Sequence, residues 1–259
     1  MKRLLSLTIA LAVALGMAAC AAPAPTPEPV PTAEPTPAAA ATVAPTPEPT
    51  QEPVVVFTDT VLEELVRKAM KKPEGSITLE EAAAVKELNL EMEGGVPIPR
   101  VKDVSDLAQF PNLTFLNLNW AFYNDGKDVD ISPLAGMTKL ECLYICCDDI
   151  ADISALSGMT NMKDLWIWGN RITDISALSG MTQMESLWMK TNKITDVSAL
   201  SGMKNLVYLY MEDNQVADLS PLAGLTKLTN FKLSGNPAKD YSPLKDVYPN
   251  LTEKDFEVK

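Results

Sequence analysis

The chain has 259 residues, no histidine and a formal net charge of −12. The negative charge disfavours binding to nucleic acid or to anionic lipid headgroups, because both are polyanions. The lack of histidine excludes His-based triads and His metal ligands, and it weakens the case for acid–base catalysis near neutral pH. The sequence also holds no nucleophile motif or phosphate-binding loop. We therefore expect that the protein is not an enzyme and that it has no catalytic residue, metal or cofactor.

Residues 1–19 have the layout of an export signal. Two basic residues precede an uncharged run, 4–17, that is shorter than the ~20 apolar residues of a membrane-spanning helix. Small residues then meet Cys20, which resembles a bacterial lipoprotein signal with cleavage before Cys20 and a lipid on its sulfur. An ordinary secretory signal cut after Ala19 is the alternative. We expect an exported, surface-located protein that touches the membrane only through the lipid on Cys20.

Residues 20–53 read as a tether that follows the signal. Eleven of the twenty prolines of the chain fall here, interleaved with Ala, Thr and Glu. A segment with so few core-forming residues cannot offset its ordering entropy, so we expect disorder. The proline density stiffens such a chain towards extended polyproline II, which would hold a folded domain away from a membrane.

Residues 54–102 are expected to form a helical cap and a first strand. Apolar residues in 58–71 recur on one helical stripe, which predicts an amphipathic helix. Residues 78–81, Thr-Leu-Glu-Glu, have the form of a capping box and predict a second short helix. The first strand is expected at 88–90.

From residue 131 to residue 240 the sequence repeats every 22 residues, with units starting at Ile131, Ile153, Ile175, Val197 and Leu219. An altered sixth unit starts at Tyr241. A fixed period of this length predicts stacked units whose core is completed by their neighbours. Within each unit, apolar residues spaced by two, such as Leu143 and Ile145, predict a strand with one buried face.

Three further columns are expected to hold the coil. A polar column following the strands predicts a ladder of side-chain bonds to the backbone: Asp148, Asn170, Asn192, Asn214 and Asn236. A column of acids precedes a serine by two residues, and we interpret it as turn capping rather than calcium binding: Asp103, Asp130, Asp152, Asp174, Asp196, Asp218 and Asp240. Glycines are expected to end the turns with positive φ: Gly136, Gly158, Gly180, Gly202 and Gly224. The residues between Asn119 and Asp130 depart from the period and are interpreted as a longer surface loop.

The columns combine into LxxLxLxxNxI, as in MKDLWIWGNRI at 162–172 and LVYLYMEDNQV at 206–216. This pattern resembles the leucine-rich repeat of the 22-residue, internalin-like class, found in bacterial proteins that also carry an N-terminal helical cap. The resemblance implies an α/β solenoid: a right-handed arc with a parallel sheet on its concave side and short 3₁₀ or helical turns on its convex side. Residues 103–259 would hold the repeats, of which the C-terminal one is irregular.

In such a sheet the residue between two buried apolar positions points outwards. These outward positions are Asn117, Tyr144, Trp166, Trp188, Tyr210 and Lys232. Neighbouring outward positions add Phe115, Trp168 and Tyr208, together with Lys190. The sequence therefore predicts a row of four consecutive aromatic residues on the concave face, from Tyr144 to Tyr210.

Two interpretations of the aromatic row remain open. The rings could simply stabilise adjacent strands, or they could form a recognition surface, because contiguous exposed aromatics mark interfaces. We favour recognition of a protein partner, in adhesion or interaction, which is also what the resemblance implies. Glycan or cell-wall polysaccharide binding by the same row is an alternative, and a structural spacer in the envelope is another.

Overall fold

The computed structural model describes residues 52–92, 100–122 and 128–258. The chain divides into a unit of residues 1–49 and a unit of residues 50–259. The predicted signal at 1–19, the lipidated Cys20 and all but the last two residues of the predicted tether at 20–53 lie outside the described residues. So do positions 123–127 of the predicted surface loop.

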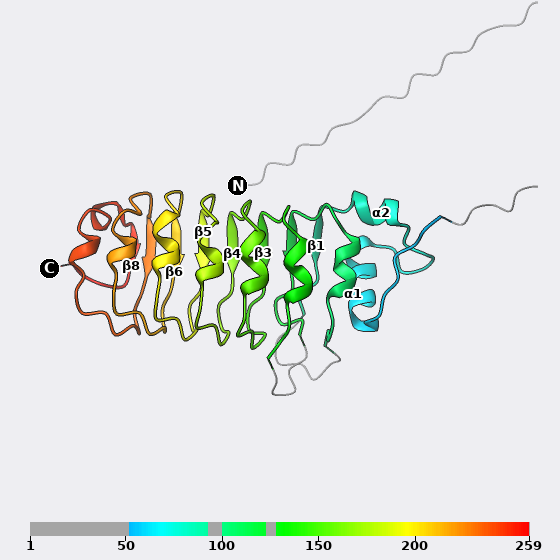
Figure 1. The fold of residues 1–259 in the computed structure, drawn as a ribbon, viewed down its shortest axis with the longest axis horizontal. Coiled ribbons are helices and arrows are strands. Elements are labelled where there is room, and N and C mark those ends of the chain that lie inside the picture. The colour runs from blue at the N-terminus through cyan, green and yellow to red at the C-terminus, as the bar shows by residue number, and fades with distance from the viewer. Residues whose placement is uncertain (1–51, 93–99, 123–127, 259) are drawn as a thin grey trace, which may run out of the picture. The chain divides into compact units, whose positions relative to one another are not determined.

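In the described part of the repeat unit, eight short strands form one parallel sheet in which they pair in chain order (Figure 1). Their bounds are β1 Glu87–Asn89, β2 Phe115–Asn117, β3 Cys142–Tyr144, β4 Asp164–Trp166, β5 Ser186–Trp188, β6 Tyr208–Tyr210, β7 Asn230–Lys232 and β8 Glu253–Lys254. The central residues stand in one line, as in the pairing of Leu143 with Leu165 and of Leu165 with Leu187. Each repeat therefore adds one strand to the sheet and one inward-facing apolar side chain from that strand to the core.

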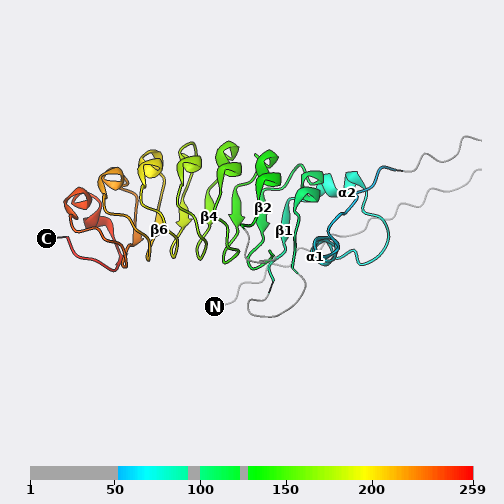
Figure 2. The same cartoon turned by 60° about the horizontal axis from the view of Figure 1, so that its bottom comes forward.

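Short 3₁₀ turns connect the strands on the other side of each coil. The turns cover Ser105–Gln109, Ser132–Gly136, Ser154–Gly158, Ser176–Leu178, Ser198–Gly202, Ser220–Leu222, Ser242–Leu244 and Tyr248–Asn250. Figure 2 shows the row of turns along the outer side of a curved stack, with the strands on the inner side. The predicted solenoid arc, with its sheet on the concave side and its 3₁₀ turns on the convex side, is confirmed.

One continuous hydrophobic core fills the coils from Val55 to Phe256. At the C-terminal end it closes on an aromatic cluster, in which the ring centroid of Phe256 lies 5.2 Å from Phe231 and 5.6 Å from Tyr241. Because one core runs through the whole unit and both of its ends are covered, residues 50–259 have what they need to fold on their own.

The N-terminal end is covered by helices α1 (Thr60–Met70) and α2 (Leu79–Ala84). Asp59 caps α1 by accepting from the N–H groups of Val61 and Leu62 through Oδ1. Its other oxygen, Oδ2, accepts from the N–H groups of Lys102, at 2.7 Å, and Asp103. One carboxylate thus joins the cap to the first repeat, and its backbone hydrogen bonds hold its pKa below the usual value against the opposing effect of burial. Thr78 and Glu81 form the predicted capping box at the start of α2.

The asparagine column forms the predicted ladder. Nδ2 of Asn192 donates to the carbonyl of Ile167, one coil back, at 2.9 Å and to that of Met189 at 3.1 Å. Its Oδ1 accepts from the N–H of Ile172 at 3.0 Å. Asn170, Asn214 and Asn236 repeat this arrangement. Each amide therefore satisfies buried backbone groups of two coils at once.

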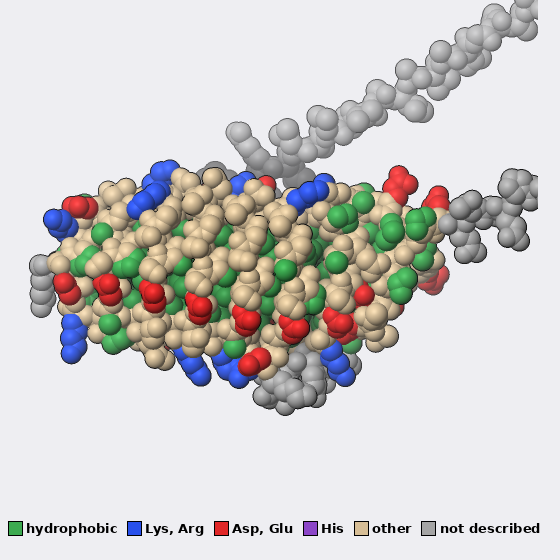
Figure 3. Space-filling view, in the orientation of Figure 1, with side chains coloured by type: hydrophobic (Ala, Val, Ile, Leu, Met, Phe, Trp, Pro, Cys, Tyr) green, Lys and Arg blue, Asp and Glu red, His purple; other side chains and the backbone are tan. Residues whose placement is uncertain are grey.

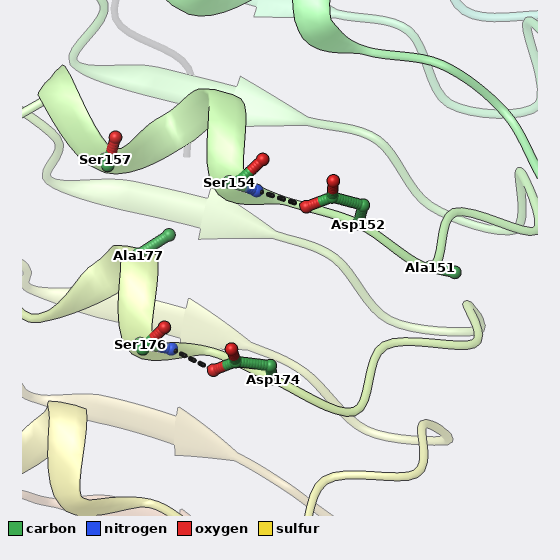
Figure 4. Close-up of a pocket in the computed structure, with 7 residues that line it drawn as sticks. All are labelled: Ala151, Asp152, Ser154, Ser157, Asp174, Ser176 and Ala177. Atoms are coloured by element: carbon green, nitrogen blue, oxygen red, sulfur yellow. Dashed lines mark hydrogen bonds between the residues drawn. The ribbon is translucent and has the colours of Figure 1, made fainter.

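The acidic column caps the turns, as predicted. In all seven pairs the aspartate Oδ1 accepts from the backbone N–H of the serine two residues later, at 2.7 to 2.9 Å. Figure 4 shows two of these pairs, Asp152 with Ser154 and Asp174 with Ser176, beside a depression of about 480 Å³. Figure 3 shows acidic side chains in a row along this face of the unit. The bonds lower the pKa of Asp152 and Asp174, so both stay ionised at neutral pH.

The glycine prediction is wrong. Gly136, Gly158, Gly180, Gly202 and Gly224 are absent from the residues with positive φ. The left-handed position instead follows strands β2 to β7, at Trp120, Cys147, Gly169, Thr191, Asp213 and Gly235, with φ between 54° and 76°. Only two of these six residues are glycines, so composition did not reveal the column. A Cβ on Gly169 would lie 2.7 Å from Sγ of Cys147, so glycine is needed there for space as well as for φ.

Replacing Thr191 with glycine is expected to stabilise the domain by about 1 kcal/mol, because a β-branched residue at φ 56° is strained. The bond from the Thr191 N–H to the carbonyl of Glu212 stays in place. Gly169→Ala should destabilise the domain, since it adds a Cβ against the Cys147 sulfur. Urea unfolding of both variants checks this, and a loss of stability in Thr191→Gly would contradict it.

Candidate functional site

Four aromatic side chains form one stacked row on the concave face, which we name the aromatic ridge: Tyr144, Trp166, Trp188 and Tyr210. The strand register places them side by side on β3 to β6. Their ring centroids are 4.3, 4.8 and 4.2 Å apart along the row, with interplanar angles of 24°, 29° and 37°. This spacing follows from the strand spacing of ~4.8 Å in a sheet, which matches the separation of stacked rings.

Stacking decides which part of each ring a partner can reach. All four side chains are partly buried, and the two tryptophans have a ring on each side. Their faces are therefore occupied within the row, and their edges are what remains open. The ridge presents an edge-on apolar strip rather than a set of free aromatic faces.

The Tyr144 hydroxyl and the indole N–H groups of the ridge form hydrogen bonds with nearby side chains. Asp164, at the start of β4, accepts from the Tyr144 hydroxyl at 2.7 Å and from Nε1 of Trp166 at 2.9 Å. Nε1 of Trp188 donates to Oγ of Ser186 at 3.1 Å. Burial, and then the bond to Asp164, raise the pKa of Tyr144 far above its ordinary value, so its hydroxyl stays protonated. These bonds fix the rings and leave the strip apolar.

The two ends of the ridge have different neighbouring residues. Towards β2, the Phe115 ring meets Tyr144 edge-on, at a centroid distance of 5.4 Å and an angle of 88°. Asn117, predicted to point outwards, is only 5% exposed because its amide donates to Glu91 and its Oδ1 accepts from the Asn119 N–H. Towards β7, Lys232 stands 5.6 Å from the Tyr210 centroid and pairs with Glu253 at 2.5 Å.

Two more aromatic residues lie beside the ridge. Tyr208 is 43% exposed, which makes it one of the few large hydrophobic residues that are exposed in the described domain. Trp168 is half-buried, and Nζ of Lys190 stands 5.3 Å from its ring centroid. The structure therefore brings all nine predicted partner-binding residues to one face. Four of them are stacked, and the others border the stack or its ends.

One position of the asparagine ladder holds an aspartate, Asp148, and the pKa of its carboxyl is raised. Asp148 occupies the ladder position of the first regular unit and is 2% exposed. Its Oδ1 accepts from the N–H of Phe122 at 3.1 Å, but Oδ2 has no hydrogen-bond partner within the described residues. Burial raises the pKa of this carboxyl to about 8, against the opposing effects of the Phe122 bond and of Arg100.

The sequence signalled this site only by a departure from a column, because aspartate stands where the other units carry asparagine. Burial of the carboxylate and the lack of a donor for Oδ2 were not predicted. The bonds of Asp164 to two rings of the ridge were not predicted either. Neither contact leaves a mark on the repeat pattern, since both depend on side-chain direction.

A family model described as leucine-rich repeats in two copies matches residues 160–202 and 204–246. No curated protein matches the chain. Among solved structures, the chain is similar to an internalin, InlF, from Listeria monocytogenes, with 33% identity and a TM-score of 0.69. That match covers 78% of this chain, which in turn spans only 58% of the internalin.

Internalin C2 from the same organism is 25% identical with a TM-score of 0.65, and the match covers 81% of this chain and all of that one. A leucine-rich repeat protein from Leptospira interrogans shares the fold at 18% identity and a TM-score of 0.54, with 70% of this chain and 51% of that chain covered. Within the described residues, no helix is long and apolar enough to cross a membrane. The strand register, the asparagine ladder and these likenesses show that the described part of the chain folds as a leucine-rich repeat solenoid, similar to that of the internalins.

Proposed function

We propose that this protein is an exported binding module that recognises a protein partner through the aromatic ridge. The observation that carries the proposal is the row of four stacked rings, whose edges are open on the concave side of the arc. Tryptophan and tyrosine contribute most to interface energetics when they are held rigidly, and the ridge holds them before any partner arrives. Phe115, Trp168, Tyr208, Lys190 and Lys232 would form its border.

Strand stabilisation alone accounts poorly for the whole surface. Stacked pairs do stabilise adjacent strands, by ~0.5–1.5 kcal/mol each. Tyr208, however, lies outside the stack and is 43% exposed, so its ring adds little to the fold. A large exposed ring beside an apolar strip is expected at an interface.

The stacking also distinguishes between a protein partner and a glycan. A sugar ring packs its C–H groups against the face of an aromatic ring, where the electron density lies. The tryptophan faces of the ridge are already covered by neighbouring rings. Side chains of a protein can pack against ring edges, so the geometry favours a protein.

The proposal includes export and anchoring. The signal-like residues 1–19 would carry the chain out of the cytoplasm, and a lipid on Cys20 would hold it at the cell surface, with 20–53 as the tether. The open concave strip supports binding rather than catalysis. If the protein were instead a structural spacer, it would stay in the envelope when the rings are removed.

Trp166→Ala and Trp188→Ala are each expected to weaken binding of a surface-extract protein by roughly thirtyfold, as for central interface residues. Each should also destabilise the domain by ~1–2 kcal/mol through lost stacking. Binding of residues 50–259 and of the two variants, immobilised and compared at equal folded fraction, measures the first effect. Tyr248→Ala, which removes a ring near Phe256 at the C-terminal end, is the matched control.

If both tryptophan variants retain every protein that the wild-type domain retains, the ridge is not the binding surface. If the domain retains a polysaccharide but no protein, and this retention depends on Trp166, then the partner is a glycan and not a protein. Envelope retention that survives both substitutions would support the spacer.

A further inference from the structure

The concave face carries a charge pattern that constrains the partner. Three outward rows cross strands β1 to β7: the row of the ridge and one row on each side of it. Within the described residues these rows hold four carboxylates and two lysines. The carboxylates are Glu87, Glu91, Asp164 and Glu212, and the lysines are Lys190 and Lys232. The rows are therefore acidic, as is the whole chain at −12.

The two lysines already have partners on this face. Nζ of Lys232 lies 2.5 Å from Glu253 on β8, and this bond is the main cause of the raised pKa of the lysine. Lys190 stands over the Trp168 ring at 5.3 Å. In the described part of the chain, none of the four carboxylates has a lysine or arginine within ion-pair distance. The rows on both sides of the ridge therefore keep a net negative charge, although Lys232 also interacts electrostatically with Glu212.

Asp164 and Glu212 bracket the rings most closely. Asp164 lies two residues before Trp166 on one side of the ridge, and Glu212 lies two residues after Tyr210 on the other. The bonds to Asp164 come from neutral donors, which orient the carboxylate without cancelling its charge. Two strand spacings and four residues of strand separate the two groups, which amounts to a diagonal of roughly 16 Å. The apolar strip runs between them.

We infer that the partner of the ridge is a cationic protein segment, whose apolar side chains lie on the ring edges and whose lysine or arginine groups pair with Asp164 and Glu212. This inference rests on the proposed function and adds the chemistry of the partner. Complementary charge at the border accelerates encounter and rejects like-charged partners, while the buried apolar contact supplies most of the affinity.

The test uses residues 50–259 and three synthetic peptides of equal length. The peptides share a central leucine and phenylalanine stretch and carry lysine, glutamine or glutamate flanks. Calorimetry should give a dissociation constant about tenfold lower for the lysine peptide than for the glutamine peptide at low salt, and the weakest binding for the glutamate peptide. The preference should shrink towards unity at ~0.5 M salt, where the Debye length is a few ångströms.

Glu212→Gln should lower severalfold both the affinity for the lysine peptide and the preference for it over the glutamine peptide. Glu64→Gln, an equal charge change at an exposed position of α1, is the matched control and should change neither. Trp166→Ala should weaken all three peptides. Equal binding of the three peptides, still weakened by Trp166→Ala, would overturn the charge inference and leave the ridge standing as a site.

A lysine preference that ignores Trp166→Ala would overturn the placement on the ridge, and with it the proposed function. Failure of the lysine peptide to bind at all would overturn the cationic partner, while the surface-extract experiment would still decide the ridge independently.

Discussion

Replacing Asp148 with asparagine is expected to stabilise the domain by roughly 3–5 kcal/mol at pH 8 and by roughly 1 kcal/mol at pH 5. The side chain is 2% exposed, and its Oδ2 lacks a hydrogen-bond partner in the described structure. An ionised carboxylate at this place loses its hydration without a full replacement. Asparagine would carry no charge, and by analogy with Asn170 its amide could donate to the carbonyl three residues earlier.

The pH dependence follows from the direction of the pKa shift. Folding raises the pKa of the Asp148 carboxyl to about 8, against ~4 in an unfolded chain. Between these values the folded protein binds a proton that the unfolded chain does not. The wild-type domain should therefore lose stability as pH rises from ~4 to ~8, and change little from this group above that. In Asp148→Asn that slope should disappear.

Urea unfolding at a series of pH values measures both effects. The matched control is Glu64→Gln, which neutralises an exposed acid of α1 and leaves the ladder untouched. Equal stability differences for Asp148→Asn at pH 5 and pH 8 would contradict the raised pKa. A destabilised Asp148→Asn at pH 8 would show that Arg100 compensates the buried charge more completely than the geometry indicates.

Much of the fold could be predicted because the repeat enforces it. One period places Leu143, Leu165 and Leu187 in line, and the same period places the asparagines and the capping aspartates. Each of these roles depends on a backbone position that recurs, so the sequence pattern is sufficient. The left-handed position after strands β2 to β7 also recurs, but residues as different as Thr191 and Gly169 fill it. No composition signal marks it, and the glycines of the convex turns drew the prediction to the wrong place.

The candidate site was predictable in its position and not in its contacts. Alternation along the strand put Tyr144, Trp166, Trp188 and Tyr210 on one face, as the register requires. Whether such rings stack or splay depends on rotamers and on side-chain bonds such as those of Asp164. The structure stacks the four predicted rings into one edge-on strip, and the proposed preference for a protein partner over a sugar rests on that stacking. Side-chain chemistry, more than backbone placement, therefore determines what the face can bind.

The converse substitution, Asn192→Asp, is expected to destabilise the domain by roughly 3–5 kcal/mol at pH 8. The ionised carboxylate of this variant would turn an oxygen towards the carbonyls of Ile167 and Met189, which now receive the amide at 2.9 and 3.1 Å. Burial and these carbonyls would raise the pKa of the new carboxyl, so stability should fall as pH rises above ~4, and much of the loss should be recovered near pH 4.

Asn192→Ala is the control: it removes the same bonds without a charge, so its loss of stability should not depend on pH. If the aspartate variant instead loses equal stability at pH 4 and pH 8, the missing donors outweigh the buried charge. The raised pKa at Asp148 would then need a cause particular to the surroundings of that residue rather than to the ladder position itself.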